Sequence, residues 1–139
     1  MALTIATWSP DGKLGAVALK AASAVTSDTT ETAVEVGKGK FRLVIAITAI
    51  DVDTADDLYM VLFEANSRNA TTTWSRITPK MAFGHSTATG DSSSDGTDTY
   101  EMIVDNPYDY QVRVKTIVVG TVSTGINYTA DAYYVISQH

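Results

Sequence analysis

The chain contains no cysteine, only two histidines and only three prolines among its 139 residues. Without cysteine it can hold no disulfide, no zinc–thiolate or iron–sulfur site and no thiol nucleophile. Basic side chains are also scarce, because ten Lys and Arg stand against sixteen Asp and Glu, a net charge of −6. A protein that coats nucleic acid needs a basic face to neutralise phosphates, so this balance argues against a nucleic-acid partner.

Long apolar runs are missing as well. The longest apolar run extends from Leu43 to Ile50 and is interrupted by Thr48. It falls far short of the ~18 apolar residues that cross a bilayer. The first residues lack the basic region and the long apolar region of a secretory signal. We therefore expect a protein that is made and used in a cytoplasm, or released without secretion, with no membrane partner.

What the chain does have is a composition typical of β-structure. Threonine is the commonest residue, with 20 copies, whereas glutamate occurs only 4 times. Branched and aromatic side chains suit a pleated, half-buried strand, whereas helix surfaces favour Glu, Lys, Leu and Ala. The chain length fits one domain with its own core.

The alternation of apolar and polar side chains indicates where the strands lie. The clearest strand covers 41–50, where Leu43, Ile45 and Ile47 share one face. The strand at 57–65 is apolar on both faces, so it is either central with a covered outer face or lies at a subunit contact. Further strands are predicted at 32–36, 73–77, 80–84, 100–104, 110–119 and 127–137. The polar stretch 85–99 is expected to be an exposed loop.

About eight short strands separated by turn signals, with no convincing helix, predict an all-β fold. We expect an antiparallel two-sheet sandwich of the jelly-roll type, with an immunoglobulin-like sandwich as the alternative. Residues 28–139 are expected to form this single domain. The Ala-rich residues 1–27 are interpreted as an extended N-terminal arm, although 14–25 also fit a short strand.

The chain offers no convincing catalytic or cofactor-binding set. His85 borders the long polar stretch and His139 is the last residue, and no Gly-x-Ser-x-Gly elbow accompanies them. The glycines at 37 and 39 are too few to form a phosphate-binding loop. We therefore expect a protein that is not an enzyme and that needs no cofactor.

The best metal candidate is an acidic run that contains Asp51, Asp53, Asp56 and Asp57. Carboxylates at such spacing suit Ca²⁺, but an EF-hand loop that starts at Asp51 would place Leu62 where the bidentate Glu is needed. A looser set follows at Asp91, Asp95 and Asp98. Both sets are interpreted as solvated turns, with a bound cation as the alternative, and no metal is assigned.

Three stretches carry a resemblance to a known family. They are 31–50 (ETAVEVGKGKFRLVIAITAI), 58–74 (LYMVLFEANSRNATTTW) and 110–136, which has alternating Arg and Lys, a Thr-Gly loop and a Tyr-rich closing strand. In pattern and order they resemble the small head-decoration, or cement, proteins of tailed bacteriophages, over about half of the chain. The resemblance implies a jelly-roll-like fold, a homo-oligomer (often a trimer) and a structural role without chemistry.

That resemblance also implies a location of the protein in the virion and a binding partner. The protein would bind the major capsid protein on the exterior of the virion, after synthesis in the host cytoplasm. A glycan-binding β-sandwich module, or a head-fibre or tail structural protein, is the alternative function. An enzyme is a third hypothesis, for which no residues can be named.

Two groups of residues are candidates for capsid or subunit contact. Lys38, Lys40 and Arg42 form a small basic patch, which is either a soluble hairpin tip or a contact to an acidic capsid surface. Trp8 lies in the predicted arm, where it either packs on its own domain or anchors the arm in a neighbouring chain.

Aromatic residues of the predicted strands form the second group. Tyr59 and Phe63 share one face of the doubly apolar strand and are candidates for a subunit contact, because Tyr and Trp are favoured in interfaces. The alternatives are a place in the core or, for aromatics such as Trp74 and Tyr108, a platform that stacks on sugars.

Overall fold

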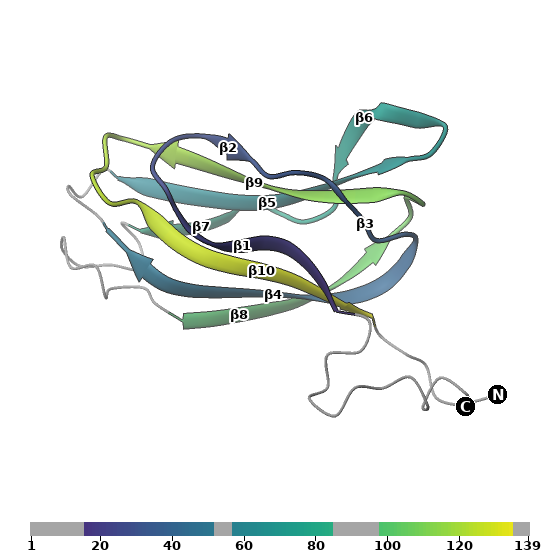
Figure 1. Cartoon of the computed structure of the whole chain (residues 1–139), viewed down its shortest axis with the longest axis horizontal. Helices are drawn as coiled ribbons and strands as arrows, with labels where there is room; N and C mark the ends of the chain where they lie inside the picture. The colour runs from purple at the N-terminus through teal and green to yellow at the C-terminus, as the bar shows by residue number, and fades with distance from the viewer. Residues whose placement is uncertain (1–15, 52–56, 85–97, 135–139) are drawn as a thin grey trace.

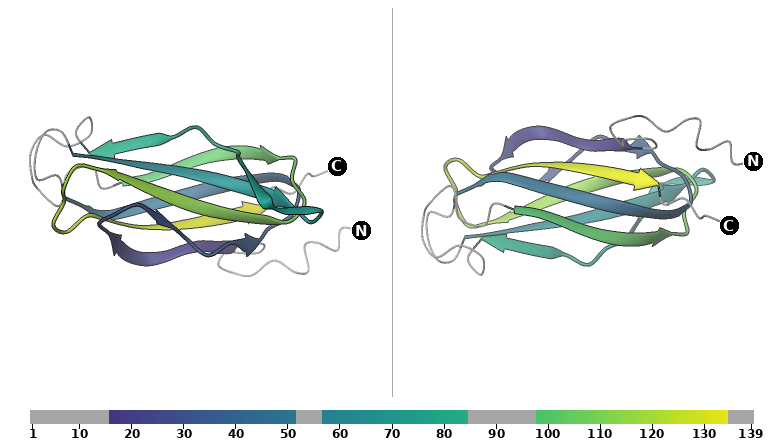
Figure 2. Two further views of the ribbon diagram at one scale, coloured as in Figure 1. Left: turned by 90° about the horizontal axis from the view of Figure 1, so that it is seen from above. Right: turned by 90° about the horizontal axis from the view of Figure 1, so that it is seen from below.

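The computed structural model describes residues 16–51, 57–84 and 98–134, and these ranges contain β-strands as their only regular elements. The strands form two antiparallel sheets that pack face to face (Figures 1 and 2). No helix in the described ranges is long and apolar enough to cross a membrane. The predicted all-β sandwich is therefore confirmed.

One sheet has four strands. In spatial order they are β1 (Val17–Val25), β10 (Ile126–Tyr134), β4 (Gly39–Ile50) and β8 (Asp98–Asn106). The central pair is in register from Phe41 opposite Tyr134 to Ile50 opposite Ile126, with one bulge. β8 pairs with β4 along its whole length and forms one edge of the sheet.

The other sheet has six strands around the long pair β9 (Gln111–Val119) and β5 (Leu58–Ser67). The short strands β2 (Thr29–Thr30) and β3 (Val34–Glu35) pair with β9. On the far side of β5 lie β6 (Ala70–Arg76) and β7 (Met81–Gly84). The β5–β6 hairpin projects at one end of the sandwich (Figure 1).

The strand order is that of a jelly roll. If β2 with β3 and β6 with β7 are each counted as one strand, eight strands run in the orders 1-8-3-6 and 2-7-4-5. Successive strands cross from one sheet to the other at nearly every connection. In an immunoglobulin domain, by contrast, the first two strands lie in the same sheet. The jelly-roll prediction is therefore confirmed, and the immunoglobulin-like alternative is wrong.

The core lies between the sheets and follows the alternation read from the sequence. Leu43, Ile45 and Ile47 of β4 are buried, as predicted. Tyr59 and Phe63 of β5 face them and are fully buried, so neither side chain offers a surface to another chain. Their prediction as contact residues is wrong because the inner face of this central strand is needed for the core. Each such side chain stabilises the fold by roughly 1.5–3 kcal/mol.

The prediction of an arm over residues 1–27 needs a correction. Strand β1 lies within that range and pairs with β10 as an edge of the four-stranded sheet. Its apolar pattern is irregular because its register with β10 shifts on both sides of Lys20. The Lys20 side chain is buried, and its Nζ donates hydrogen bonds to the carbonyls of Tyr128 (2.9 Å) and Ser23 (2.9 Å). Trp8 lies outside the described residues.

Candidate functional site

The predicted basic patch does not form one cluster of free cations. Lys38 and Lys40 are exposed in and next to the turn that leads into β4. Arg42 lies further along β4, where it forms an ion pair with Glu101 (2.8 Å) and covers the ring of Tyr133, with its guanidinium carbon 4.8 Å from the ring centre. Lys40 and Arg42 therefore share the outer face of the four-stranded sheet, and only Lys38 belongs to the turn.

The two residues of the acidic run that the structure describes, Asp51 and Asp57, are buried and have structural roles. Asp51 is buried, and its Oδ2 accepts a hydrogen bond from the backbone N–H of Thr124 (3.0 Å), while its carbonyl accepts one from the Tyr59 hydroxyl. Asp57 is buried as well. Asp53 and Asp56 lie outside the described residues, as do His85, His139, Asp91 and Asp95. Within the described ranges, no three His, Asp or Glu side chains gather as a metal site.

The outer face of the six-stranded sheet carries a cluster of charged side chains that form ion pairs with one another. Glu64 of β5 pairs directly with Arg113 of β9 (Nη2–Oε1, 2.8 Å) and more distantly with Lys115 (3.8 Å). The guanidinium of Arg113 also covers the Trp74 ring of β6. Because the Glu64 and Arg113 side chains are only 15% and 24% exposed, these contacts are less screened than those of a surface pair.

An apolar row continues along the same outer face. Leu58 lies opposite Val119 and Met60 opposite Ile117, and these four side chains, the apolar row, point away from the core. Val119 is 42% exposed and the other three are half-buried. The doubly apolar strand predicted from the sequence is therefore central, and part of its outer face is open to solvent.

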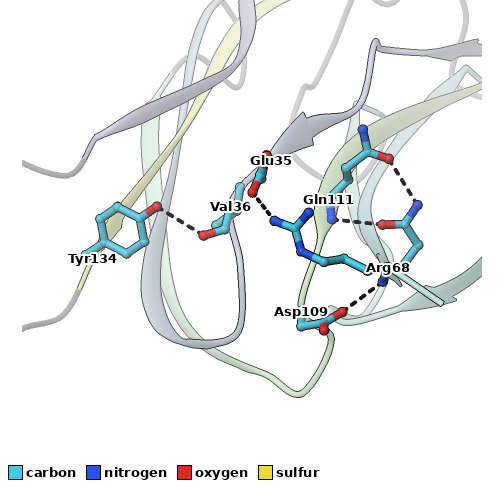
Figure 3. Close-up of polar contacts among 7 residues, drawn as sticks. Glu35, Val36, Arg68, Asp109, Gln111 and Tyr134 are labelled. Atoms are coloured by element: carbon cyan, nitrogen blue, oxygen red, sulfur yellow. Dashed lines mark hydrogen bonds and ion pairs between the residues drawn. The ribbon is translucent and has the colours of Figure 1, made fainter. Parts of the chain in front are cut away.

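A polar network fixes the base of the projecting hairpin (Figure 3). The amide of Asn66 is fully buried, accepts a hydrogen bond from the backbone N–H of Gln111 (2.8 Å) and donates one to the Gln111 side chain (3.1 Å). At the tip, the Arg68 side chain pairs with Glu35, and its backbone N–H donates to Asp109 (2.9 Å). The hairpin is therefore tied to β9, to β3 and to the connection that precedes β9.

The contacts of Glu64 and Arg113 were not predicted, because they depend on strand pairing. These two residues come from different strands and their only sequence signal is an outward position in each strand, whereas Trp74 was predicted only as a candidate for a sugar platform. Ile103 of β8 was also missed, although it is 57% exposed on the outer face of the four-stranded sheet. An apolar residue at an outward position of an edge strand is the signal that was available.

Comparisons with known proteins give little beyond the fold. No family model matches the chain, and no curated protein matches it. Among solved structures it is similar to a chain from the structure of the infectious bursal disease virus Gx strain, at 4% identity and a TM-score of 0.46. The match covers 84% of this chain but only 30% of the length of that chain. A likeness at this level adds nothing to the strand order described above.

Proposed function

We propose that the protein is a non-enzymatic structural component of a virion that decorates and stabilises a bacteriophage capsid from outside. The observation that carries this proposal is the apolar row beside the Glu64–Arg113–Trp74 cluster on one rigid sheet face. Contiguous apolar side chains rimmed by polar ones mark surfaces that bind other proteins. The partner on the capsid is the major capsid protein, and the site of assembly is the host cytoplasm.

The geometry suits attachment in many copies. The apolar row comprises four half-buried or exposed side chains, so a single contact through it is small. Linking several such contacts in one homo-oligomer multiplies weak binding into stable attachment. A trimer is the oligomer that the resemblance to decoration proteins favours. The jelly-roll strand order supports the proposal, because virus capsid domains use it, although lectin domains use it too.

The glycan-binding alternative gains no support from the aromatic side chains. A sugar platform needs an open ring face, but Arg113 covers one face of Trp74, with its guanidinium carbon 4.0 Å from the ring centre. Tyr108 is half-buried and packs against the core. The arrangement of both rings is explained by packing.

The proposal is tested by counting the chain in purified particles. Quantitative mass spectrometry should find it in a fixed ratio to the major capsid protein, on the order of one to one or one to three. Its absence from particles would contradict the proposal, and a few copies per particle would indicate a fibre or tail component instead.

A variant pair tests the surface itself. Ile117→Lys places a charge in the apolar row and should abolish rebinding to particles stripped of the protein. The matched control is Thr48→Lys, which places the same charge at an exposed position of the four-stranded sheet and should rebind normally. Equal rebinding by both variants would show that the apolar row is not the attachment surface.

A further inference from the structure

Each sheet has two edges in the described part of the chain, and β8 and β6 are edge strands of different sheets. β8 pairs with β4 over its full length, from Asp98 opposite Ile47 to Asn106 opposite Gly39, and no described strand lies on its other side. β6 pairs with β5 and likewise ends the six-stranded sheet. Such an edge presents unpaired backbone N–H and C=O groups that can bind a further strand.

The edge of β6 has neither charges nor prolines to protect it against pairing before Arg76, although its pairing with β5 has a register shift between Ala65 and Ser67. From Ala70 to Ser75 it contains no charged residue and no proline, and residues 70–73 are all exposed. The network around Asn66 and Arg68 holds this strand in a fixed position at the end of the sandwich (Figures 1 and 3). Natural edges are commonly shielded by charges, prolines or bulges, so an uncharged and ordered edge indicates a partner.

The edges of β6 and β8 carry opposite charges. β6 is flanked by Arg68 and Arg76, whereas the outer face of β8 carries Glu101 and Asp105. Two antiparallel copies of β6 would bring Arg76 of one copy towards Arg68 of the other, and like charges that face each other are destabilising. With its acidic outer face, β8 of another copy is a complementary partner for β6.

We propose that β6 of one copy pairs antiparallel with β8 of a second copy. The register that keeps the outer faces continuous and places Arg76 opposite Glu101 also places Trp74 opposite Ile103. This pairing accounts for the 57% exposure of Ile103 in the single chain, since the neighbouring indole would cover it. The contact is head-to-tail, so repeated use closes a ring when the rotation permits.

This inference deepens the proposed function, because it identifies how copies of the chain associate, but it uses no residue of the apolar row. The first test compares Ile103→Ala with Val119→Ala by sedimentation equilibrium. Both residues are already exposed in one chain, so both variants should keep the melting temperature of the single chain. Ile103→Ala should raise the dissociation constant of self-association about tenfold, whereas Val119→Ala should not change it.

The second test is a charge exchange between copies. Arg76→Glu alone places two acidic side chains opposite each other and Glu101→Arg alone places two basic ones, so each variant should self-associate at least about tenfold more weakly. An equimolar mixture should regain association, because each reversed edge meets a complementary edge on the other variant. Glu101→Gln removes the Arg42 ion pair without reversing the charge and should show a smaller loss than Glu101→Arg.

The outcomes separate this inference from the proposed function. A wild-type chain that is monomeric at all concentrations would overturn the edge pairing, as would a mixture that associates no better than its components. Restored association in the mixture supports it, even if Ile117→Lys rebinds to particles and the proposed attachment surface fails.

Discussion

The guanidinium carbon of Arg113 lies 4.0 Å from the centre of the Trp74 ring, so a cation on β9 covers an aromatic side chain on β6. The two strands are not neighbours, because β5 lies between them. Arg113 reaches across β5, where its guanidinium also pairs with Glu64. This side chain therefore ties the projecting hairpin to the middle of the six-stranded sheet.

A double-mutant cycle should detect the energetic coupling between Arg113 and Trp74. Arg113→Ala and Trp74→Ala should each lower the free energy of unfolding, with a coupling of about 0.5–2 kcal/mol between them, because the cation is partly desolvated. Urea denaturation of the four proteins measures the coupling. The same cycle on Arg68 and Tyr110, a pair with a similar geometry (4.6 Å) but a 57% exposed arginine, should give a smaller value. Equal coupling energies in both pairs would show that burial of the arginine does not strengthen its contact with the ring.

Asn66 should be needed for the position of the hairpin. Asn66→Ala leaves the half-buried Gln111 N–H and the carbonyl of the exposed Thr71 without their partner, which should cost about 1–3 kcal/mol in total. Amide hydrogen exchange in residues 70–76 should accelerate more than exchange in β4. Asn66→Asp should lose more stability than Asn66→Ala at neutral pH, because its carboxylate would face two oxygens that now accept hydrogen bonds. Unchanged exchange in β6 would show that the hairpin is held by other contacts.

Tyr128 should make the fold sensitive to alkaline pH. Burial raises the pKa of its hydroxyl above the ordinary value of 10.0, while the hydrogen bond with Thr116 acts in the opposite direction. The neutral phenol is therefore favoured in the folded chain, and this contribution is fully present below pH ~10 and is lost as the pH rises further. The loss has a limiting slope of about 1.4 kcal/mol per pH unit for one group. Urea midpoints measured between neutral and strongly alkaline pH should fall less steeply for Tyr128→Phe.

Lys20 affects the pH dependence of stability with the opposite sign, and over a lower pH range. Burial lowers the pKa of its ammonium group, so the folded chain releases this proton at a lower pH than the unfolded chain does. Its contribution to stability therefore rises with pH between the lowered pKa and the ordinary value of 10.5. Comparison of Tyr128→Phe with the wild type removes this background, because both proteins retain Lys20. Parallel pH profiles for the two proteins would contradict the assigned role of Tyr128.

Gly125 should not tolerate a side chain. Its φ is +82°, and a Cβ would lie 2.1 Å from the backbone oxygen of Val25. Gly125→Ala should therefore destabilise the fold by about 2–4 kcal/mol, from backbone strain and overpacking together. Gly37→Ala is the control, since its φ is +89° but a Cβ there meets no atom within 4 Å, and it should cost only about 1–2 kcal/mol. Similar losses for both variants would show that the contact with Val25 relaxes easily.

Local patterns account for the parts of the fold that were predicted. The alternation in 41–50 predicts the buried face of β4, because a strand turns successive side chains to opposite faces whatever its neighbours are. The hairpin was harder to predict, since the residues between the predicted strands 57–65 and 73–77 were assigned to no strand. Both faces of β6 are exposed near its tip, so no apolar alternation marks it, although its threonines favour extended backbone.

Composition and periodicity are local properties, so they were enough to indicate an all-β, cysteine-free chain with an acidic balance and about eight alternating segments. That Tyr59 and Phe63 lie in the core and that β1 belongs to the sheet follows from the tertiary structure. It alone brought Trp74, Arg113 and Glu64 together and left β6 and β8 with free edges of opposite charge. The reason is physical: strand order and register arise from contacts between residues far apart in the chain, and periodicity does not say which strands become neighbours.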